Sequence, residues 1–493
     1  MRERTLTSKN KEEVKHFFDD VLNIGIDFKT KTRVSDSYFS IEENQQNIIK
    51  PLDSTWLTLE GVLEDFKTNI LPFCTNFSSE NFMGFTDAGN SIAALGWAML
   101  KDFLQQNLIN QSFCAPSATF VEIAVIRWLR ETIGYQNKES DNLKNIFWVG
   151  GIITSWWTWS NAIGMMLARE NRYPWTMESW MYNPENCCIF VPKWIGHYSV
   201  KSWAMWAWCG NNLIEVETKD FRYDLEDLKN KLGQYEGRVM AVVAYAWDSR
   251  TMTVDNLKEV YRIVKSYNQN IWLHADACHW FSLGFSQDLR YKISGIELFD
   301  SVTLDPHKVM LTPYTISALL VKNPEDFKKV ISLSDLIMQE DYAFWQITPF
   351  IWSKSWESLK LWFMMKHYGK DWLDNLITTR HNLAKYLEGK LNKDSDFIVI
   401  NKVEINAVAF MFKPKSKIIN TSQINEINKK IHSQILQEWK YHLHQFSIPD
   451  DGKIEKWIIV YPLRFMSWNP NTTEVHIDAM IEYIRNLWHK LII

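Results

Sequence analysis

The stretch that decides the fold runs from Ile271 to Lys322. Three short apolar segments make up most of it: IWLHADAC (271–278), DSVTLDPHK (300–308) and ISALLVK (316–322). Apolar runs of this length, rich in β-branched residues, predict buried strands. Asp276 ends the first predicted strand, and His307 and Lys308 follow the second. An acid and a lysine are therefore expected at the ends of consecutive strands.

The pairing of Asp276 with Lys308 indicates a particular chemistry. A desolvated lysine is a nucleophile towards carbonyl groups, and sites for pyridoxal 5'-phosphate (PLP) combine a Schiff-base lysine with an acidic partner for the pyridinium nitrogen. A lysine after a strand is more commonly a solvated loop residue, so the pair alone leaves both interpretations open. The surrounding sequence favours the first.

The motifs around this pair resemble those of one enzyme family. HADA (274–277), DSVTLDPHK (300–308) and SALLV (317–321) are similar to segments of the group II PLP-dependent amino-acid decarboxylases. That family includes the glutamate, aromatic amino-acid, histidine and tyrosine decarboxylases. The resemblance extends from about Asn81 to Asn471.

The resemblance implies the PLP-dependent transferase type I fold. Residues 81–375 would form a large PLP-binding domain of the α/β class with a mostly parallel seven-stranded sheet, and residues 376–493 a small C-terminal α+β domain. Residues 1–80 would form a helical dimerisation arm, although the sequence alone also fits a mobile extension. Alternating predicted strands and helices between residues 187 and 275 independently predict an α/β domain.

The same resemblance assigns roles to individual residues. Lys308 would hold PLP as a Schiff base, and the anion of Asp276 would keep the ring nitrogen protonated. His197, in HYSVK (197–201), would stack on the ring; a structural histidine is the alternative. Arg464 would bind a substrate carboxylate through its planar fork, with a surface ion pair as the alternative. The phosphate would be held by Ser155, Trp157, Thr158 and His307.

The expected phosphate site departs from the family pattern. GGIITSWWTWSN (150–161) precedes a predicted helix from Ala162 to Glu170, and a turn before a helix N-terminus binds phosphate through free backbone N–H groups. The family has Thr-Ser-Gly-Gly-Thr here, because glycine lets the backbone approach the anion closely. This chain has Trp156 and Trp157 at the glycine positions, so two indoles would occupy the space of the phosphate.

Tryptophan also stands at other positions where the family has glycine, including Trp247, Trp280, Trp352, Trp372 and Trp468. The chain has 25 Trp and only 18 Gly, whereas average usage gives about 35 Gly in this length. One hypothesis is a decoding artefact, because some bacteria read UGA as glycine and a table that reads UGA as tryptophan converts those glycines to Trp. The rival is a genuinely Trp-rich homologue that no longer binds PLP. TGA codons at the suspect positions favour the first hypothesis, and TGG codons the second.

Composition and charge argue against several other classes. A net charge of −4 and a pI of about 6.3 give no sign of nucleic acid or an anionic membrane as partner. The charged start MRER leads into no apolar segment, and no apolar run approaches the length of a membrane span. Six scattered cysteines without paired metal spacing indicate reduced thiols in a cytoplasmic protein, with no metal site.

The predicted function is PLP-dependent decarboxylation of an L-amino acid to the amine and CO2, in a homodimer. The family's catalytic loop often carries a tyrosine that protonates the substrate carbon, but the stretch from Asn323 to Gln339 contains no tyrosine. Another PLP enzyme of the same fold, such as an aldehyde-forming enzyme, a lyase or an aminotransferase, therefore stays open. So does a non-catalytic homologue. The sequence does not identify the amino acid.

Overall fold

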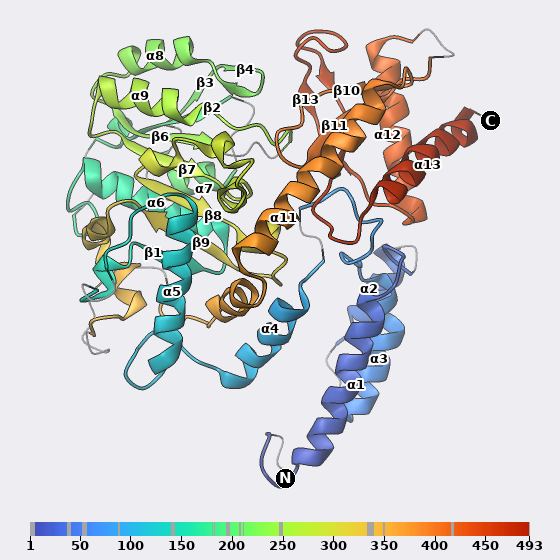
Figure 1. The fold of residues 1–493 in the computed structure, drawn as a ribbon, viewed down its shortest axis with the longest axis horizontal. Coiled ribbons are helices and arrows are strands. Elements are labelled where there is room, and N and C mark those ends of the chain that lie inside the picture. The colour runs from blue at the N-terminus through green and yellow to red at the C-terminus, as the bar shows by residue number, and fades with distance from the viewer. Residues whose placement is uncertain are drawn as a thin grey trace. The chain divides into compact units, whose positions relative to one another are not determined.

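The structure is a computed structural model of the 493-residue chain. It describes all residues except 1–4, 37–40, 52–56, 87–88, 140–142, 180, 182, 194–197, 207–208, 211, 246–249, 333–339, 349–350, 416–418 and 493. The chain divides into two compact units (Figure 1). The large unit comprises Asn90–Lys385 and Asn401–Ala407, and the small unit comprises Met1–Gly89, Tyr386–Ile400 and Val408–Ile493.

A seven-stranded sheet forms the centre of the large unit, in the order β1-β9-β8-β7-β6-β2-β3. Its strands are β1 (Gly151–Thr154), β2 (Cys188–Pro192), β3 (Leu213–Val216), β6 (Val239–Tyr245), β7 (Trp272–Asp276), β8 (Ser301–Leu304) and β9 (Ser317–Val321). Neighbouring strands from β3 to β8 are parallel, and β9 is antiparallel to both β8 and β1. The predicted mostly parallel sheet is confirmed. A separate hairpin is formed by β4 (Thr218–Lys219) and β5 (Arg222–Tyr223).

Helices make up much of the rest of the large unit. They are α4 (Ile92–Leu104), α5 (Pro116–Thr132), α6 (Trp157–Arg172), α7 (Tyr198–Trp206), α8 (Leu225–Gln234), α9 (Leu257–Tyr267), α10 (Pro306–Val309) and most of α11 (Ser358–Asn392). Helix α6 packs across β6 to β9, α5 packs on β1 and β9, and α8 lies beside α9 (Figure 1). Strands β6, β7 and β8 are accordingly buried along their whole length. Strand β6 is a continuous apolar run, which is typical of a strand covered on both faces, whereas β7 and β8 also bury polar side chains such as His274 and Ser301.

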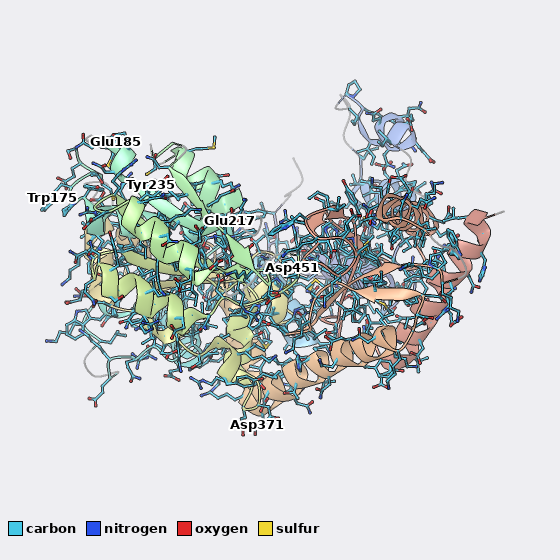
Figure 2. All side chains as sticks on the ribbon, turned by 90° about the horizontal axis from the view of Figure 1, so that it is seen from above. Trp175, Glu185, Glu217, Tyr235, Asp371 and Asp451 are labelled. Carbon is cyan, nitrogen blue, oxygen red and sulfur yellow. The ribbon has the colours of Figure 1, made fainter. Side chains whose placement is uncertain are left out.

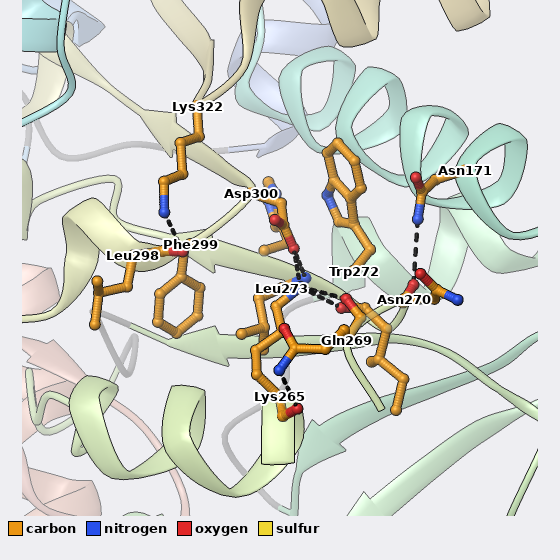
Figure 3. A network of polar contacts seen from close by, with 12 residues as sticks. Asn171, Lys265, Gln269, Asn270, Trp272, Leu273, Leu298, Phe299, Asp300 and Lys322 are labelled. Atoms are coloured by element: carbon orange, nitrogen blue, oxygen red, sulfur yellow. Dashed lines mark hydrogen bonds and ion pairs between the residues drawn. The ribbon is translucent and has the colours of Figure 1, made fainter. Parts of the chain in front are cut away.

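A polar network fixes the start of β7 (Figure 3). Asp300 Oδ2 accepts hydrogen bonds from the backbone N–H of Leu273 at 2.8 Å and from Lys265 Nζ at 2.9 Å. Lys265 lies in the last turn of α9, so the ion pair ties the end of that helix to the segment before β8. Because β7 carries Asp276 at its other end, this anchor also helps to position the acid.

The small unit contains a four-stranded sheet in the order β10-β11-β15-β12. These strands are β10 (Phe397–Val399), β11 (Ala407–Phe412), β12 (His444–Gln445) and β15 (Leu463–Met466), and a second pair is β13 (Ile448–Pro449) with β14 (Ile459–Val460). Its helices are α1 (Lys11–Lys29), α2 (Ile41–Ile48), α3 (Leu59–Asn69), α12 (Thr421–Glu438), α13 (Glu474–Ile492) and the end of α11. The predicted C-terminal α+β domain is confirmed.

Residues 1–89 belong to the same compact unit as the C-terminal segment. Phe82 stacks on His442 with ring centroids 4.6 Å apart, and the backbone N–H of Met83 donates to the His442 carbonyl at 3.0 Å. The residues after α3 are thus attached to the small unit by direct contacts. The separate dimerisation role of residues 1–80 stays a prediction.

Candidate active site

Lys308 lies just beyond the carboxyl end of β8, on the short helix α10. Its Nζ lies 2.6 Å from Asp305 Oδ2, and both side chains are buried. Burial disfavours the charge on the Lys308 ammonium, but the carboxylates of Asp305 and Asp276, together with Cys278, outweigh burial and raise the pKa of Lys308. The amine is therefore held as a cation between acids.

Asp276 lies at the carboxyl end of β7, the parallel neighbour of β8. Its Oδ2 accepts a hydrogen bond from Asn161 Nδ2 at 3.1 Å, and its Oδ1 accepts one from Cys278 Sγ at 2.7 Å. Burial raises the pKa of Asp276, and the bonds from Cys278 and Asn161, with the charge of Lys308, oppose that rise. The structure thus brings Asp276 and Lys308 into one buried cluster, as the strand ends predict.

Trp157, the first residue of α6, also contacts this cluster. The centre of its indole lies 4.2 Å from Lys308 Nζ, and its Nε1 donates to Ser199 Oγ at 3.1 Å. Ser199 also accepts from Asn161 Nδ2 at 2.9 Å. The indole therefore occupies the space directly beside the lysine amine.

The predicted phosphate turn is shorter than expected. Helix α6 begins at Trp157, not at Ala162, and the backbone N–H of Ser160 already donates to the Trp156 carbonyl at 3.3 Å. The Ser160 side chain is fully buried, with its Oγ 2.8 Å from Thr154 Oγ1. Only Ser155 and Trp156 remain as the turn, while Thr158 lies in the first helical turn. Ser155 and Trp156 line a cavity of about 250 Å³ that is also lined by Trp159, Trp352, Lys354 and Glu357.

The other predicted site residues have separate positions. His307 donates from Nδ1 to the Ile316 carbonyl at 2.7 Å, which fixes its ring beside β9. His197 and Trp247 lie outside the described residues. Arg464 belongs to the small unit, where it is 3% exposed and donates to the Gly84 carbonyl at 3.2 Å. The roles of these residues stay predictions.

Two neighbours of the cluster, Asp305 and Asn161, were not assigned a role from the sequence. Asp305 directly precedes the Pro-His-Lys triplet, so its position next to the lysine could have been predicted from the motif. Asn161 meets Asp276 across 115 positions, and no local pattern indicates that contact.

Three tryptophans have backbone conformations that suit glycine. Trp175, Trp439 and Trp457 have φ angles of 74°, 47° and 72°, in the left-handed region that bulky side chains rarely adopt. Trp439 is the C-terminal cap of α12, where glycine is the usual residue. Trp175, at the edge of the large unit in Figure 2, is 71% exposed, and Trp457 is 64% exposed. Neither indole contributes to a core.

Two suspect tryptophans are buried without a hydrogen-bond acceptor. Trp280 and Trp468 are 0% and 1% exposed, and within the described part of the chain neither indole N–H has an acceptor. Burying an N–H in this way is unfavourable. Trp345 and Trp356 share this feature, so it does not by itself separate suspect from ordinary positions. The buried Trp272, by contrast, donates to a serine at 2.8 Å.

Comparison with known proteins identifies the family. The pyridoxal-dependent decarboxylase conserved domain matches residues 45–413, which is more than half of the chain. The chain belongs to this family. Its members relevant here are group II PLP-dependent decarboxylases, so the chain is a carboxy-lyase homologue with PLP as the family cofactor. The predicted family, enzyme class and cofactor are confirmed at this level.

Relatives within the family differ in their reactions and substrates. Phenylacetaldehyde synthase from Petunia hybrida is 24% identical over 454 residues, covering 87% of this chain and 84% of that protein. Aromatic-L-amino-acid decarboxylase from Bacillus atrophaeus is 23% identical over 427 residues, covering 84% and 82%. Human cysteine sulfinic acid decarboxylase is 28% identical over 315 residues, covering 61% of each chain.

Solved structures share the fold of this decarboxylase homologue. Mouse CSAD in the apo form has a TM-score of 0.86 and 21% identity, covering 96% of this chain and 98% of that chain. Oryza sativa TDC with PLP and tryptamine has a TM-score of 0.87 and 17% identity, covering 99% and 100%. These likenesses confirm the type I fold. Among the described residues, every helix is too short or too polar to span a membrane.

Proposed function

We propose that this chain decarboxylates an L-amino acid to the amine and CO2, with PLP bound at Lys308. One observation carries the proposal: the Lys308 amine lies 2.6 Å from Asp305 in a buried cluster that also contains Asp276. A lysine and an acid at the ends of adjacent parallel strands are the pair that PLP chemistry requires. The family match over residues 45–413 supports the assignment.

Each predicted residue has a task in this proposal. PLP, when bound, supplies an electron sink for the bond that breaks at the substrate Cα. Lys308 would carry the cofactor, and Asp276 would face the ring nitrogen and favour its protonated form. His197 would stack on the ring, and Arg464 would bind the substrate carboxylate. The phosphate would meet the backbone N–H groups at the start of α6, with Ser155, Thr158 and His307.

The polar groups of the cluster fit PLP, but the Trp157 indole does not. A cofactor bonded to the Lys308 amine must begin at that atom, and the indole centre lies only 4.2 Å away. We therefore propose that the active protein has glycine at 156 and 157 and at the other suspect positions, through UGA read as glycine. We call this the glycine form and the printed sequence the tryptophan form. The left-handed backbone at Trp175, Trp439 and Trp457 is consistent with this proposal, and Phe221, Met252 and Leu311 share that conformation.

Peptide mass spectrometry of the natively produced protein tests the decoding proposal. The peptide from residues 145–169 contains four tryptophans, at 148, 156, 157 and 159. Glycine masses at 156 and 157, with a tryptophan mass at Trp272, support it. Tryptophan masses at 156 and 157 contradict it and favour a homologue that has lost PLP.

Product analysis tests the reaction. The glycine form, incubated with PLP and a panel of L-amino acids, should release an amine and CO2 from at least one of them. An aldehyde or a keto acid would instead support the second candidate, another PLP reaction on the same fold. The absence of tyrosine from 323–339 favours that candidate, as does the similarity to a protein named phenylacetaldehyde synthase.

The protein is also proposed to be a cytoplasmic homodimer. Helices α1 and α3 have no buried residues, and Leu22, Ile26 and Val62 are 37%, 57% and 51% exposed. A second copy that covers these side chains explains their exposure. The six free cysteines are consistent with a reducing compartment. Light scattering should give twice the chain mass for the wild type, and Ile26→Asp should shift it towards the monomer.

A further inference from the structure

A buried hydrogen-bond chain leads through the large unit to Asp276. Trp272 Nε1 lies 2.8 Å from Ser301 Oγ, which lies 2.7 Å from His274 Nδ1. His274 Nε2 lies 2.9 Å from Asn161 Oδ1, and Asn161 Nδ2 lies 3.1 Å from Asp276 Oδ2. All five side chains are at most 3% exposed. Solvent therefore does not compete for these bonds.

The donor and acceptor at every link follow from the chemistry of the groups. The Asp276 carboxylate accepts, so the Asn161 amide must present its N–H₂ there and turn its oxygen towards His274. An amide oxygen only accepts, so the proton of His274 is on Nε2. At the other end, the indole of Trp272 only donates, so Ser301 accepts from it and gives its own proton to His274 Nδ1. The bonds all point the same way, towards the acid.

Packing holds the imidazole in the plane that this chain needs. A Cβ at Gly164 of α6 would lie 3.0 Å from both Cε1 and Nδ1 of His274. A larger residue would require the ring or the helix to shift, and the same helix carries Asn161 one turn earlier. The histidine and the asparagine are thus locked together by α6.

We infer that His274 is a positioning residue for the cofactor: it orients Asn161, which in turn orients the Asp276 carboxylate. This inference rests on the proposed function, in which Asp276 faces the ring nitrogen. His274 touches neither the acid nor Lys308 in any described contact. It acts through Asn161: its N–H holds the amide oxygen, and together with the bond from Asn161 Nδ2 to Ser199 this keeps the N–H₂ group towards Asp276.

Cofactor affinity provides the first test, in the glycine form. His274→Leu removes the donor to Asn161 and should weaken PLP binding about tenfold or more. His274→Gln retains an N–H near the Nε2 position and should restore part of that loss. Thr303→Val is the control for the weaker bond, because Thr303 Oγ1 lies 3.4 Å from His274 Nε2 and should contribute less than Asn161 to holding the ring. A folded His274→Leu protein that binds PLP as tightly as wild type overturns the inference.

The apo protein provides a second readout, which does not depend on PLP. In protein labelled with ¹⁵N-histidine, the His274 signal is the one lost in His274→Gln. It should show the proton on Nε2 and no titration between about pH 5 and 8, because burial lowers the pKa of His274 to about 3. Ser301→Ala should shift the Nδ1 signal, and it serves as the milder variant if His274→Leu does not fold.

The two readouts separate the possible failures. A proton on Nδ1, or titration of His274 within that range, contradicts the inference whatever the cofactor does. A wild-type glycine form that keeps the Nε2 tautomer but binds no PLP contradicts the proposed function instead.

Discussion

The amine of Lys308 lies 4.2 Å from the centre of the Trp157 indole. The same amine forms an ion pair with Asp305, and its charge opposes the rise in the pKa of Asp276. The groups that suit a PLP site are therefore present together with one that blocks it. A genuine tryptophan at 157 blocks the site, whereas a decoding artefact means that the active protein has glycine there and an open site.

Replacing the indole should open the site. In the tryptophan form, Trp156→Gly with Trp157→Gly should convert a protein without bound PLP into one that binds PLP saturably, because both the amine and the phosphate turn become accessible. Visible absorption during titration with PLP measures this. The matched control is Trp175→Gly, a surface change that should leave PLP binding as it was. Equal binding before and after the double substitution would show that the indoles do not obstruct the cofactor.

Glycine should stabilise the chain where the backbone is left-handed. Trp457→Gly should raise the free energy of unfolding by about 1 kcal/mol, because a bulky residue in this region is strained by about that amount and the side chain is 64% exposed. Trp488→Gly, within the right-handed helix α13, should lower it by about 1 kcal/mol or more. Urea unfolding measures both changes. Destabilisation by Trp457→Gly of the same size as in the control would remove this support for glycine.

Removing Asp305, the acid paired with Lys308, should lower the free energy of unfolding by an amount that depends on pH. Asp305→Asn should destabilise the apo protein by about 3 kcal/mol or more at neutral pH, because it leaves a buried cation unpaired. The folded-state pKa of Lys308 lies above its ordinary value. Its contribution to stability is therefore complete below about pH 10.4 and is lost as the pH rises through the folded pKa.

Unfolding of the wild type and Asp305→Asn by urea, at neutral pH and above about pH 10.5, checks this prediction. The difference between the two proteins should narrow at the higher pH. Glu325→Gln breaks the exposed pair with Lys328 and should change stability by less than about 1 kcal/mol. A difference that widens with pH would mean that Lys308 is not held as a cation.

Arg464 should affect the substrate and not the cofactor. Arg464→Gln in the glycine form should raise KM about tenfold or more, because a charge-assisted bond to a carboxylate is lost, while PLP affinity stays unchanged. Arg485→Gln, which breaks an ion pair with Asp396 on another part of the small unit, should leave KM unchanged. An unchanged KM with reduced stability in Arg464→Gln would identify Arg464 as structural, held by its bond to Gly84.

Local pattern was sufficient for much of the fold. The three strands predicted within residues 271–322 correspond to β7, β8 and β9, because each lies in a short apolar segment. The ends of β7 and β8 likewise placed Asp276 and Lys308 at one edge of the sheet. Parallel pairing makes that placement follow from sequence order alone.

The rest depends on contacts that are distant in sequence. Asn161 reaches His274 across 113 positions, and its amide has no local signal that distinguishes it from an ordinary polar helix residue. The start of α6 was placed too late because the tryptophans and polar residues at 156–160 conceal the helix. The left-handed conformation of Trp175 and Trp457 is visible only in the backbone itself.

The most direct test of the account is to locate the cofactor on the chain. The glycine form is incubated with PLP, reduced with borohydride, digested and analysed by peptide mass spectrometry, with Lys308→Arg treated in parallel. The account predicts a PLP adduct on the peptide that contains Lys308, and its loss in the variant. A glycine form without an adduct, or with an adduct that persists in Lys308→Arg, would contradict the claim that this protein binds PLP through Lys308.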